Sequence, residues 1–420
     1  MKESTLKDLT LNITDGKHGD CEGQDNSGYY FISCKDVHDG QIYYEGARQI
    51  TEKDYIDTHK RTQLEPNDIL ITNSGTIGRM TFIKETPLVY RTTFQKSVAI
   101  VKPNPDLIYP LYLYYQLQNC VAQFINSSNG SAQKNLLLST MRAFKIKYHS
   151  DFSIQHRIAS ILSAYDDLIE NNQKQIKLLE EAAQRLYKEW FVDLRFPNYE
   201  NTPVVDGVPE GWRYIPLENV ISYEIGGGWG EENVTEKFEK PAYVIRGTDF
   251  YGITHGNISD IPYRYHTESN LSSRELSDGD IIFEVSGGSK TEGVARTVLI
   301  REALLESYNQ PVMCASFCKL IRLVDKNLSQ FMYDTFLYLR LSGKTSEFDK
   351  KSASSIVNYR WKDFLSQQFI LIPSQEMLKK YNSLAEHYYN LIICNSKQIE
   401  KLKNARDRLL PKLMSGELEV

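Results

Sequence analysis

The longest regular pattern of apolar positions in this chain lies in residues 153–191, which contain no proline and no glycine. From Tyr165 onward, seam residues recur at alternating spacings of four and three, the 3.5-residue period of a coiled-coil helix. The seam consists of Tyr165, Ile169, Asn172, Ile176, Leu179, Ala183, Leu186 and Trp190. At about 1.5 Å per residue, a helix of this length would span on the order of 55–60 Å, which favours a spacer over a core helix of a small domain.

Residues 374–414 repeat this pattern. A shift of 223 residues places the first seam on Tyr388, Ile392, Asn395, Ile399, Leu402 and Leu409. Both stretches carry Asn-x-x-Gln-Ile, starting at Asn172 and Asn395. One asparagine on an apolar seam can fix the register of a coiled coil. The alternative is a generic amphipathic helix with an asparagine on its solvent-facing edge. We expect the two seams to form a helix pair and a partner interface.

Short β-type runs separated by glycine, aspartate and asparagine turns precede each long stretch. In the first half we expect strands at residues 29–32, 41–44, 69–72 and 93–101, and a helix at 111–124. A linker with Pro203, Gly207, Pro209 and Gly211 then leads into a second set, with strands near 281–283 and 315–324 and a helix at 330–341. Ser74-Gly75 and Ser286-Gly287 follow the matching strands. The chain is therefore predicted to repeat with a period of a little over 210 residues.

The predicted fold class is α+β, with two mixed α/β domains in tandem pseudo-repeat, separated by two long helices. The predicted boundaries are residues 1–150 for the first domain, 151–196 for the central helix, 197–372 for the second domain and 373–420 for the C-terminal helix.

Composition narrows the class of protein. A net charge of −5 does not favour a non-specific nucleic-acid binder, so any DNA-binding surface must be local or completed by partners. Six cysteines without regular spacing, together with the absence of a signal peptide or a long apolar run, predict a reduced, cytoplasmic protein that is not inserted in a membrane. Cys314 and Cys318 lack a second pair of ligands at zinc spacing, so we expect core residues.

Catalytic motifs are missing from the sequence. It has no GxxxxGK[ST] loop, no two adjacent prolines and no glutamate followed two places later by lysine. These absences count against a nucleoside triphosphate site of that type, an amino-methyltransferase and a metal-dependent nuclease. The glycine-rich run 224–230 is similar to an S-adenosylmethionine loop, but it lacks the flanking strand and helix that would position the cofactor. We therefore expect no catalytic residue and no metal site.

With both repeats in view, the chain resembles the specificity (S) subunit of Type I restriction–modification systems. The resemblance is carried by Ile-Ala-Ser-Ile-Leu-Ser-Ala-Tyr-Asp-Asp-Leu-Ile-Glu-Asn-Asn at 158–172 and by Glu-Trp-Phe-Val-Asp-Leu-Arg-Phe-Pro at 189–197. Pro-Glu-Gly-Trp at 209–212, the Asp-Ile…Ser-Gly pattern at Asp280 and more loosely at Asp68, and residues 409–418 add to it. The resemblance covers essentially the whole chain.

That family implies two target recognition domains, each reading one half of a split double-stranded DNA target, held apart by two antiparallel helices. It implies that two methyltransferase subunits bring S-adenosylmethionine and that endonuclease–translocase subunits add ATP hydrolysis with Mg²⁺, while this chain holds no cofactor. On this basis we expect Asn172 and Asn395 to lie opposite, or nearly opposite, each other.

DNA recognition needs polar and cationic side chains on base edges and phosphates. In the first domain the candidates are Lys17, His18, Asn73, Ser74, Gly75, Thr76, Arg79, Gln133 and Lys134. In the second they are Trp229, Arg246, Ser286, Gly287, Ser289, Lys290, Lys350 and Lys351. Each could instead be a solvated loop residue, and the glycine turns could be ordinary hairpin chemistry.

Two other functions stay open. The chain could be a scaffold or tether with two α/β protein-binding domains, which would show no salt-dependent DNA binding. It could also be a fragment of a fused restriction–methylation enzyme, which the missing motifs disfavour.

Overall fold

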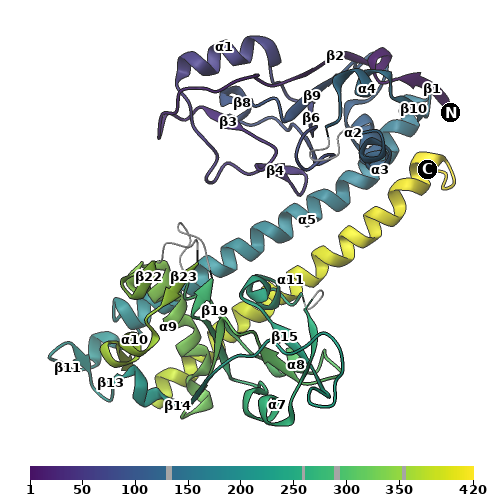
Figure 1. Ribbon diagram of the computed structural model, residues 1–420. Coiled ribbons are helices and arrows are strands. Elements are labelled where there is room, and N and C mark those ends of the chain that lie inside the picture. Colours follow the sequence, from purple (N-terminus) through teal and green to yellow (C-terminus); the bar gives the residue numbers. More distant parts are fainter. Residues whose placement is uncertain (129–134, 258–260, 288–293, 352–355) are drawn as a thin grey trace. The chain divides into compact units, whose positions relative to one another are not determined.

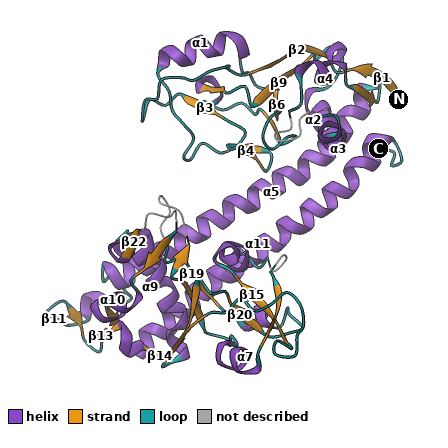
Figure 2. Cartoon of the chain, in the orientation of Figure 1, coloured by secondary structure: helices purple, strands orange, loops and turns teal. Residues whose placement is uncertain are grey.

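The chain folds into two compact units. Unit 1 comprises Met1–Leu168 with Leu402–Val420, and unit 2 comprises Ile169–Lys401. The computed structural model describes residues 1–128, 135–257, 261–287, 294–351 and 356–420. Two long helices, α5 (Phe152–Tyr187) and α11 (Gln375–Ser415), each contribute a segment to both units. Helices and strands both occur in each unit (Figure 2), which confirms the mixed α+β class.

Unit 1 is built around a small antiparallel sheet. Its strands are β1 (Lys2–Thr5), β2 (Thr10–Asp15), β3 (Tyr30–Ile32), β4 (Val37–His38), β5 (Gln41–Ile42), β6 (Ile69–Thr72), β7 (Met80–Phe82), β8 (Thr92–Phe94), β9 (Val98–Pro103) and β10 (Lys145–Tyr148). Its shorter helices are α1 (Glu52–Thr62), α2 (Pro110–Asn119), α3 (Val121–Asn126) and α4 (Leu138–Ala143). The main sheet has the order β2-β9-β6-β7, and Figure 1 labels β2, β9 and β6.

The central strand β6 shows why this sheet has two covered faces. All four of its residues are buried. Side chains alternate between faces along a strand, so Ile69 and Ile71 join a core with Tyr112 of α2 and Leu413 of α11. Leu70 joins a separate core with Ile32 and Phe94 on the other face. The continuous apolar run at 69–72 is thus a strand buried on both sides.

Two of the predicted elements are interrupted. The strand expected over 93–101 is two strands, because the chain turns at Gln95, whose carbonyl accepts from the Val98 N–H at 3.0 Å. This turn lets β8 pair in parallel with β3, while β9 joins the antiparallel sheet. The helix expected over 111–124 ends at Asn119, and α3 begins one residue after Cys120.

Unit 2 has a matching arrangement. Its strands are β11 (Val204–Val205), β12 (Val208–Pro209), β13 (Arg213–Pro216), β14 (Ile221–Gly226), β15 (Lys240–Ile245), β16 (Tyr263–His266), β17 (Ile281–Glu284), β18 (Ser286–Gly287), β19 (Thr297–Leu299), β20 (Val312–Cys314), β21 (Cys318–Leu323), β22 (Asp349–Lys351), β23 (Val357–Tyr359) and β24 (Phe369–Ile372). Its helices are α6 (Phe250–Thr254), α7 (Glu268–Arg274), α8 (Glu302–Leu305), α9 (Ser329–Leu341) and α10 (Trp361–Gln367).

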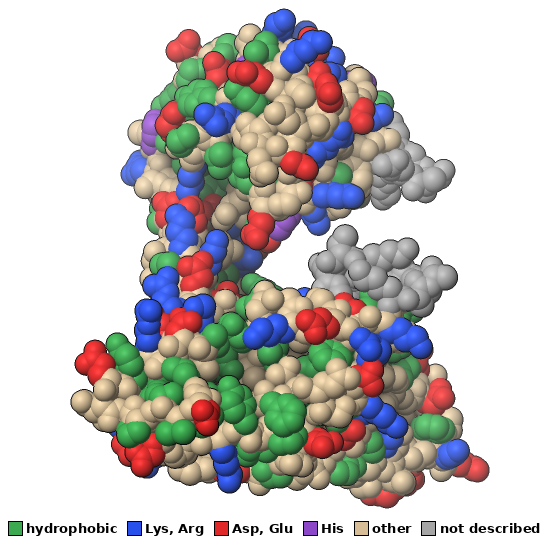
Figure 3. Space-filling model, turned by 90° about the vertical axis from the view of Figure 1, so that its left-hand side faces the viewer, with side chains coloured by type: hydrophobic (Ala, Val, Ile, Leu, Met, Phe, Trp, Pro, Cys, Tyr) green, Lys and Arg blue, Asp and Glu red, His purple; other side chains and the backbone are tan. Residues whose placement is uncertain are grey.

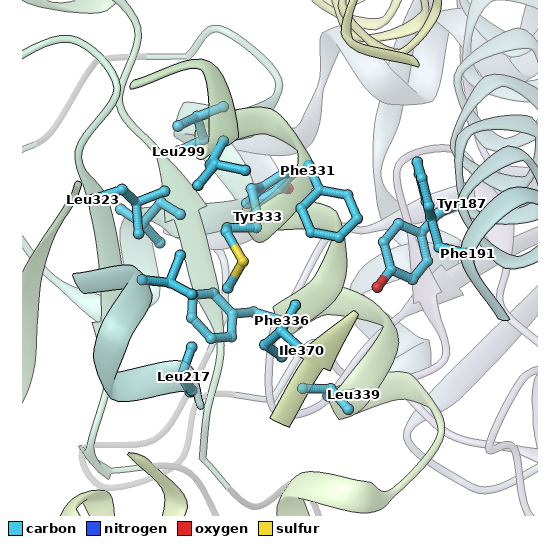
Figure 4. Close-up of a cluster of buried hydrophobic side chains, with 14 of the residues drawn as sticks. Tyr187, Phe191, Leu217, Leu299, Leu323, Phe331, Tyr333, Phe336, Leu339 and Ile370 are labelled. Carbon is cyan, nitrogen blue, oxygen red and sulfur yellow. The ribbon is translucent and has the colours of Figure 1, made fainter. Parts of the chain in front are cut away.

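The main sheet of unit 2 has the order β14-β21-β17-β19, with β17 as the fully buried central strand. A parallel pair, β15 with β20, accompanies it as β3 and β8 do in unit 1. The largest core lies between this sheet, α9 and the long helices, and Figure 4 shows Phe331 and Phe336 of α9 within it. Cys314 and Cys318 are fully buried core residues, as expected.

Within each unit, the segments of α5 and α11 run in opposite directions. In unit 1, Asp166 of α5 pairs with Arg406 of α11, whereas Ile158, nearer the start of α5, shares a core with Leu413, nearer the end of α11. In unit 2, Asn395 Nδ2 donates to Gln175 Oε1 at 3.2 Å, and the rings of Tyr187 and Tyr381 lie 6.3 Å apart. Asn395 therefore contacts the residue three positions beyond Asn172.

The predicted seam coincides with the buried side of the helices. Six seam residues are buried, namely Ile169, Asn172, Ile176, Ala183, Trp190 and Ile392, and the others are half-buried, namely Tyr165, Leu179, Leu186, Tyr388, Asn395, Ile399, Leu402 and Leu409. The α-helix of α5 ends at Tyr187, and a π-helical turn, Lys188–Val192, follows.

Candidate nucleic-acid interface

The turn that follows each central strand is tied to a distant part of the same unit. In unit 1, the Leu136 N–H donates to the Asn73 carbonyl at 2.8 Å, and Ser74 forms an antiparallel bridge with Asn135. Among the turn residues predicted to contact DNA, Ser74 is half-buried and Gly75 and Thr76 are exposed. Gly75 has a φ of +78°, a conformation that favours glycine.

Asn73 differs from the rest of that turn because it is buried, with 7% of its surface exposed. Its Oδ1 has no hydrogen-bond partner within the described part of the chain. A buried amide in this position supports the turn from below, so direct reading of a base by Asn73 is not favoured by its burial.

Unit 2 carries the same connection as a small sheet. The Tyr359 N–H donates to the Val285 carbonyl at 2.8 Å, and Ser286 then pairs with Asn358. The order of this sheet is β18-β23-β22, and Lys350 of β22 stands opposite Asn358. The structure therefore brings together three predicted contact residues: Ser286, Gly287 and Lys350.

Several predicted cations are already paired with carboxylates. Lys17 Nζ lies 3.7 Å from both Asp54 and Asp57, and His18 Nε2 lies 2.9 Å from Asp15. In unit 2, the Arg246 guanidinium makes two hydrogen bonds to Asp249, at 3.0 and 2.8 Å.

Arg79 is the contrasting case. Its side chain is exposed, and among the described residues it makes no hydrogen bond or ion pair, although Asp39 is close enough for Arg79 to help lower the pKa of that carboxyl. The matching arginine of unit 2, Arg296, forms two hydrogen bonds with the buried carboxylate of Glu284, at 2.8 and 2.5 Å. A backbone bond marks the correspondence: the Thr72 N–H donates to the Arg79 carbonyl, and the Glu284 N–H to the Arg296 carbonyl.

Trp229 lies apart from these turns, beside the pair β15–β16. It is 40% exposed, and the guanidinium carbon of Arg264 stands 4.9 Å from the centre of its ring. Four predicted contacts, Gln133, Lys134, Ser289 and Lys290, fall outside the described residues, and so does the side chain of Lys351.

Sequence reasoning missed Asn135, Asn358 and Arg264. The repeat itself could have indicated the two asparagines, because each directly precedes the apolar residue, Leu136 or Tyr359, whose N–H bonds to the turn. Arg264 had no comparable signal, since its stacking on Trp229 depends on two segments that are distant in the sequence.

Each unit also holds an aspartate at the entrance to its central strand. Asp68 accepts from Lys102 Nζ at 2.7 Å and from the Glu65 N–H at 2.8 Å, and burial raises the pKa of Asp68 to about 6 despite these bonds. Asp280 accepts two hydrogen bonds from Arg322, at 2.8 and 2.7 Å, and one from the Ser277 N–H. These paired carboxylates hold the backbone at the entrance to each central strand.

Over the described ranges, no cluster of three or more histidine, cysteine, aspartate or glutamate side chains is arranged to hold a metal ion. In the same part of the chain, no helix combines the length and apolar character needed to span a membrane. On the described residues of the face in Figure 3, Lys and Arg are interspersed with Asp and Glu. This mixed distribution of charges suits a binding surface at which only a few local cations contact the ligand.

Comparison with known proteins agrees with this picture. Residues 1–181 match the family described as the Type I restriction modification DNA specificity domain. The chain is 29% identical over 408 residues to the Type I restriction enzyme MjaIX specificity subunit of Methanocaldococcus jannaschii, covering 93% of this chain and 87% of that protein. It is also 31% identical over 149 residues to the EcoBI specificity subunit of Escherichia coli, covering 34% and 30% of the two chains.

Among solved structures, the S subunit of a Type I restriction–modification system from M. genitalium aligns over 98% of this chain and 96% of its own length. The TM-score is 0.53 at 14% sequence identity, so this likeness concerns the fold. The family match over residues 1–181 and the relatives aligned over most of the chain make this protein similar to the Type I restriction–modification DNA specificity subunits.

Proposed function

We propose that this chain is the sequence-specific DNA-recognition subunit of a Type I restriction–modification complex, with each unit carrying a target recognition domain for one half of a bipartite target. The two domains form a tandem pseudo-repeat, and α5 and α11 form an antiparallel coiled coil between them. The helices set the half-site spacing, at roughly one helical turn or about 10 bp from centre to centre.

The observation that carries this proposal is the duplicated sheet. The orders β2-β9-β6-β7 and β14-β21-β17-β19 correspond strand by strand, and the turn after β6 or β17 is bridged to a later segment of its unit, at Asn135 or Asn358. Two copies of one binding fold, both fastened to the same pair of helices, suit a target with two unlike halves. A single enclosed active site would need no such duplication.

The outer sides of the helices support the docking of partner subunits. Leu168 and Leu178 of α5 are 51% and 64% exposed, and Leu384 and Leu391 of α11 are 45% and 37% exposed. Exposed apolar side chains on a helix can contribute to a protein interface. We propose that two methyltransferase subunits bind there and hold S-adenosylmethionine, and that endonuclease–translocase subunits bring ATP and Mg²⁺. This chain would itself be non-catalytic.

The test is genome-wide sequencing of modified bases in a host that carries this chain with its methyltransferase. We expect deletion of the chain to remove one bipartite methylation motif. A control chain with Asn201→Ala, an exposed turn residue, should restore the full motif. If methylation is unchanged by deletion while the methyltransferase is active, the chain is a tether and the DNA-contact proposals fall with it.

A further inference from the structure

The two units share a second feature that the proposed function does not require: a serine–asparagine pair at the edge of each turn. Ser74 bridges Asn135 in unit 1, and Ser286 pairs with Asn358 in unit 2. The adjoining backbone bonds, Leu136 to Asn73 and Tyr359 to Val285, are both 2.8 Å long. In each unit the pair therefore lies one residue beyond the equivalent backbone hydrogen bond, so the two pairs share one register.

In unit 2 the side chains of this pair are in direct contact. Ser286 Oγ donates to Asn358 Oδ1 at 2.8 Å. Asn358 is exposed, while its neighbours on β23, Val357 and Tyr359, are buried. Since side chains alternate along a strand, the carboxamide of Asn358 faces away from the core. Lys350 stands opposite it on β22, and β22 and β23 are labelled together in Figure 1.

Folding does not explain an asparagine at this position. Asparagine is disfavoured in strands, and an exposed hydrogen bond between two neutral side chains contributes only about 0.5–1.5 kcal/mol. Asn135 is also exposed. Two exposed asparagines in the same register, in two units whose other side chains differ widely, indicate a shared use at the surface.

The chemistry of a carboxamide identifies that use. Its oxygen accepts and its nitrogen donates, which matches the N6 donor and N7 acceptor that adenine presents in the major groove. The bond from Ser286 uses one lone pair of Oδ1 and fixes which way the amide faces. The second lone pair of Oδ1 and both Nδ2 hydrogens are left for a base.

We propose that Asn358 and Asn135 each contact an adenine in the major groove, one in each half of the target, with Ser286 and Ser74 as the residues that position them. This inference rests on the proposed function, because it assigns base contacts within the recognition domains. The nearby Lys350 then supplies a phosphate contact beside the base that Asn358 reads.

The experiment is sequencing of modified bases in a host whose methyltransferase is paired with single variants of the full-length chain. In Asn358→Ala we expect discrimination for one adenine, in one half of the motif, to fall about tenfold or more. The other half should be unchanged. Asn135→Ala should give the reciprocal result, with the relaxed position in the opposite half. Asn12→Ala, an exposed strand asparagine of unit 1, is the matched control and should leave both halves intact.

Two further variants keep the test decisive if truncation disturbs folding. Asn358→Asp has the same size but can only accept, so it should change the preference at that position from adenine toward cytosine, whose N4 donates. Ser286→Ala should relax the same position as Asn358→Ala, and Ser286→Thr, which keeps the hydroxyl, should restore it. A purely structural serine would not act on one base position.

The outcomes separate the two proposals. A methylation motif that is the same with and without the wild-type chain would overturn the proposed function. A wild-type bipartite motif that is identical in Asn358→Ala, Asn358→Asp and Asn135→Ala would overturn this inference and leave the recognition role standing. Relaxation spread over both halves by Asn358→Asp would also overturn it.

Discussion

In both unit 1 and unit 2, a tyrosine–carboxylate hydrogen bond connects the helix beside the sheet to a long helix. The two units differ in which of these helices carries the carboxylate. The sixth residue of α2 is Tyr115, which donates to Asp166 of α5 at 2.6 Å. The sixth residue of α9 is Asp334, which accepts from Tyr381 and Tyr389 of α11, both at 2.6 Å. A tyrosine–carboxylate contact is thus present in both units, with the carboxylate on the long helix in one and on the sheet-side helix in the other.

This difference changes how the charge of the carboxylate is compensated in each unit. Asp166 also binds the Arg406 guanidinium at 2.5 Å, so its charge is balanced. Asp334 is 4% exposed and accepts its close hydrogen bonds from neutral donors, the two tyrosines and Gln330. Burial raises the pKa of Asp334 to about 6. The same connection is therefore an ion-paired, part-buried contact in unit 1 and a fully buried hydrogen-bond cluster in unit 2.

Removing Asp334 should have the largest effect. We expect Asp334→Ala to lower the free energy of unfolding by about 3–5 kcal/mol, because two tyrosine hydroxyls and Gln330 lose their buried acceptor. Tyr115→Phe in unit 1 should cost about 1.5–3 kcal/mol, since Asp166 keeps Arg406. Urea unfolding of the full chain measures both, with the exposed Glu181→Ala as control. An equal or larger loss for Tyr115→Phe would contradict the comparison.

The second prediction concerns a glycine that both units need for close packing. A Cβ at Gly16 would lie 1.9 Å from the Phe94 carbonyl oxygen, and one at Gly227 would lie 2.2 Å from the Ala315 carbonyl oxygen. A shift of either backbone would disturb the hydrogen bond that Gly16 donates to the Val98 carbonyl or Gly227 to the Cys318 carbonyl. Gly16→Ala and Gly227→Ala should therefore each cost about 2–4 kcal/mol. Gly226→Ala, with open space around its Cβ, is the control. Thermal unfolding should show a similar loss for both variants, and a loss in only one would argue against equivalent packing.

The third prediction concerns the buried carboxyl of Asp68. The folded-state pKa of Asp68, about 6, is above the model-peptide value of 3.8, so the folded state binds its proton more tightly. This contribution to stability is complete below about pH 4 and is lost as the pH rises through 6, amounting to roughly 2–3 kcal/mol. Asp68→Asn should therefore gain stability relative to wild type by this amount between pH 4 and pH 7.

Urea unfolding at a series of pH values measures this gain. Asp334→Asn should show a relative gain of the same sign over the same range, since burial also raises the pKa of Asp334 to about 6. A constant difference between Asp68→Asn and wild type across the range would show that Asp68 titrates normally.

The smallest effect is expected at Arg79, and its matched residue Arg296 provides the contrast. Arg79→Ala should leave folding unchanged and reduce the salt dependence of DNA binding by about one phosphate contact. Arg296→Ala should instead destabilise unit 2, because it leaves Glu284, 3% exposed, buried without its partner. DNA-binding titrations over a range of salt, with Arg79→Lys as control, decide this. An unchanged salt slope for Arg79→Ala would remove Arg79 from the interface.

The candidate site could be predicted only in part. The turns after the central strands were found because an apolar run followed by Ser-Gly is a local signal, and the structure places Ser286, Gly287 and Lys350 in one small sheet. The carboxylates that pair with the candidate cations could not be predicted in the same way. Lys17 is held by Asp54 and Asp57 of α1, a helix nearly forty residues away in the chain, and no local pattern reveals that contact.

The sequence by itself determined the two long helices, their apolar seams and the positions of the central strands Ile69–Thr72 and Ile281–Glu284, because hydrophobic periodicity and short apolar runs are local properties of the chain. Only the tertiary structure decided which cations are available to a ligand. Lys17 and Arg246 are paired with carboxylates and His18 lies 2.9 Å from Asp15, whereas the side chain of Arg79 makes no hydrogen bond or ion pair with a described residue. The charge that a side chain offers to a ligand depends on the groups that folding brings within a few ångströms of it, and those groups come from segments far apart in the sequence.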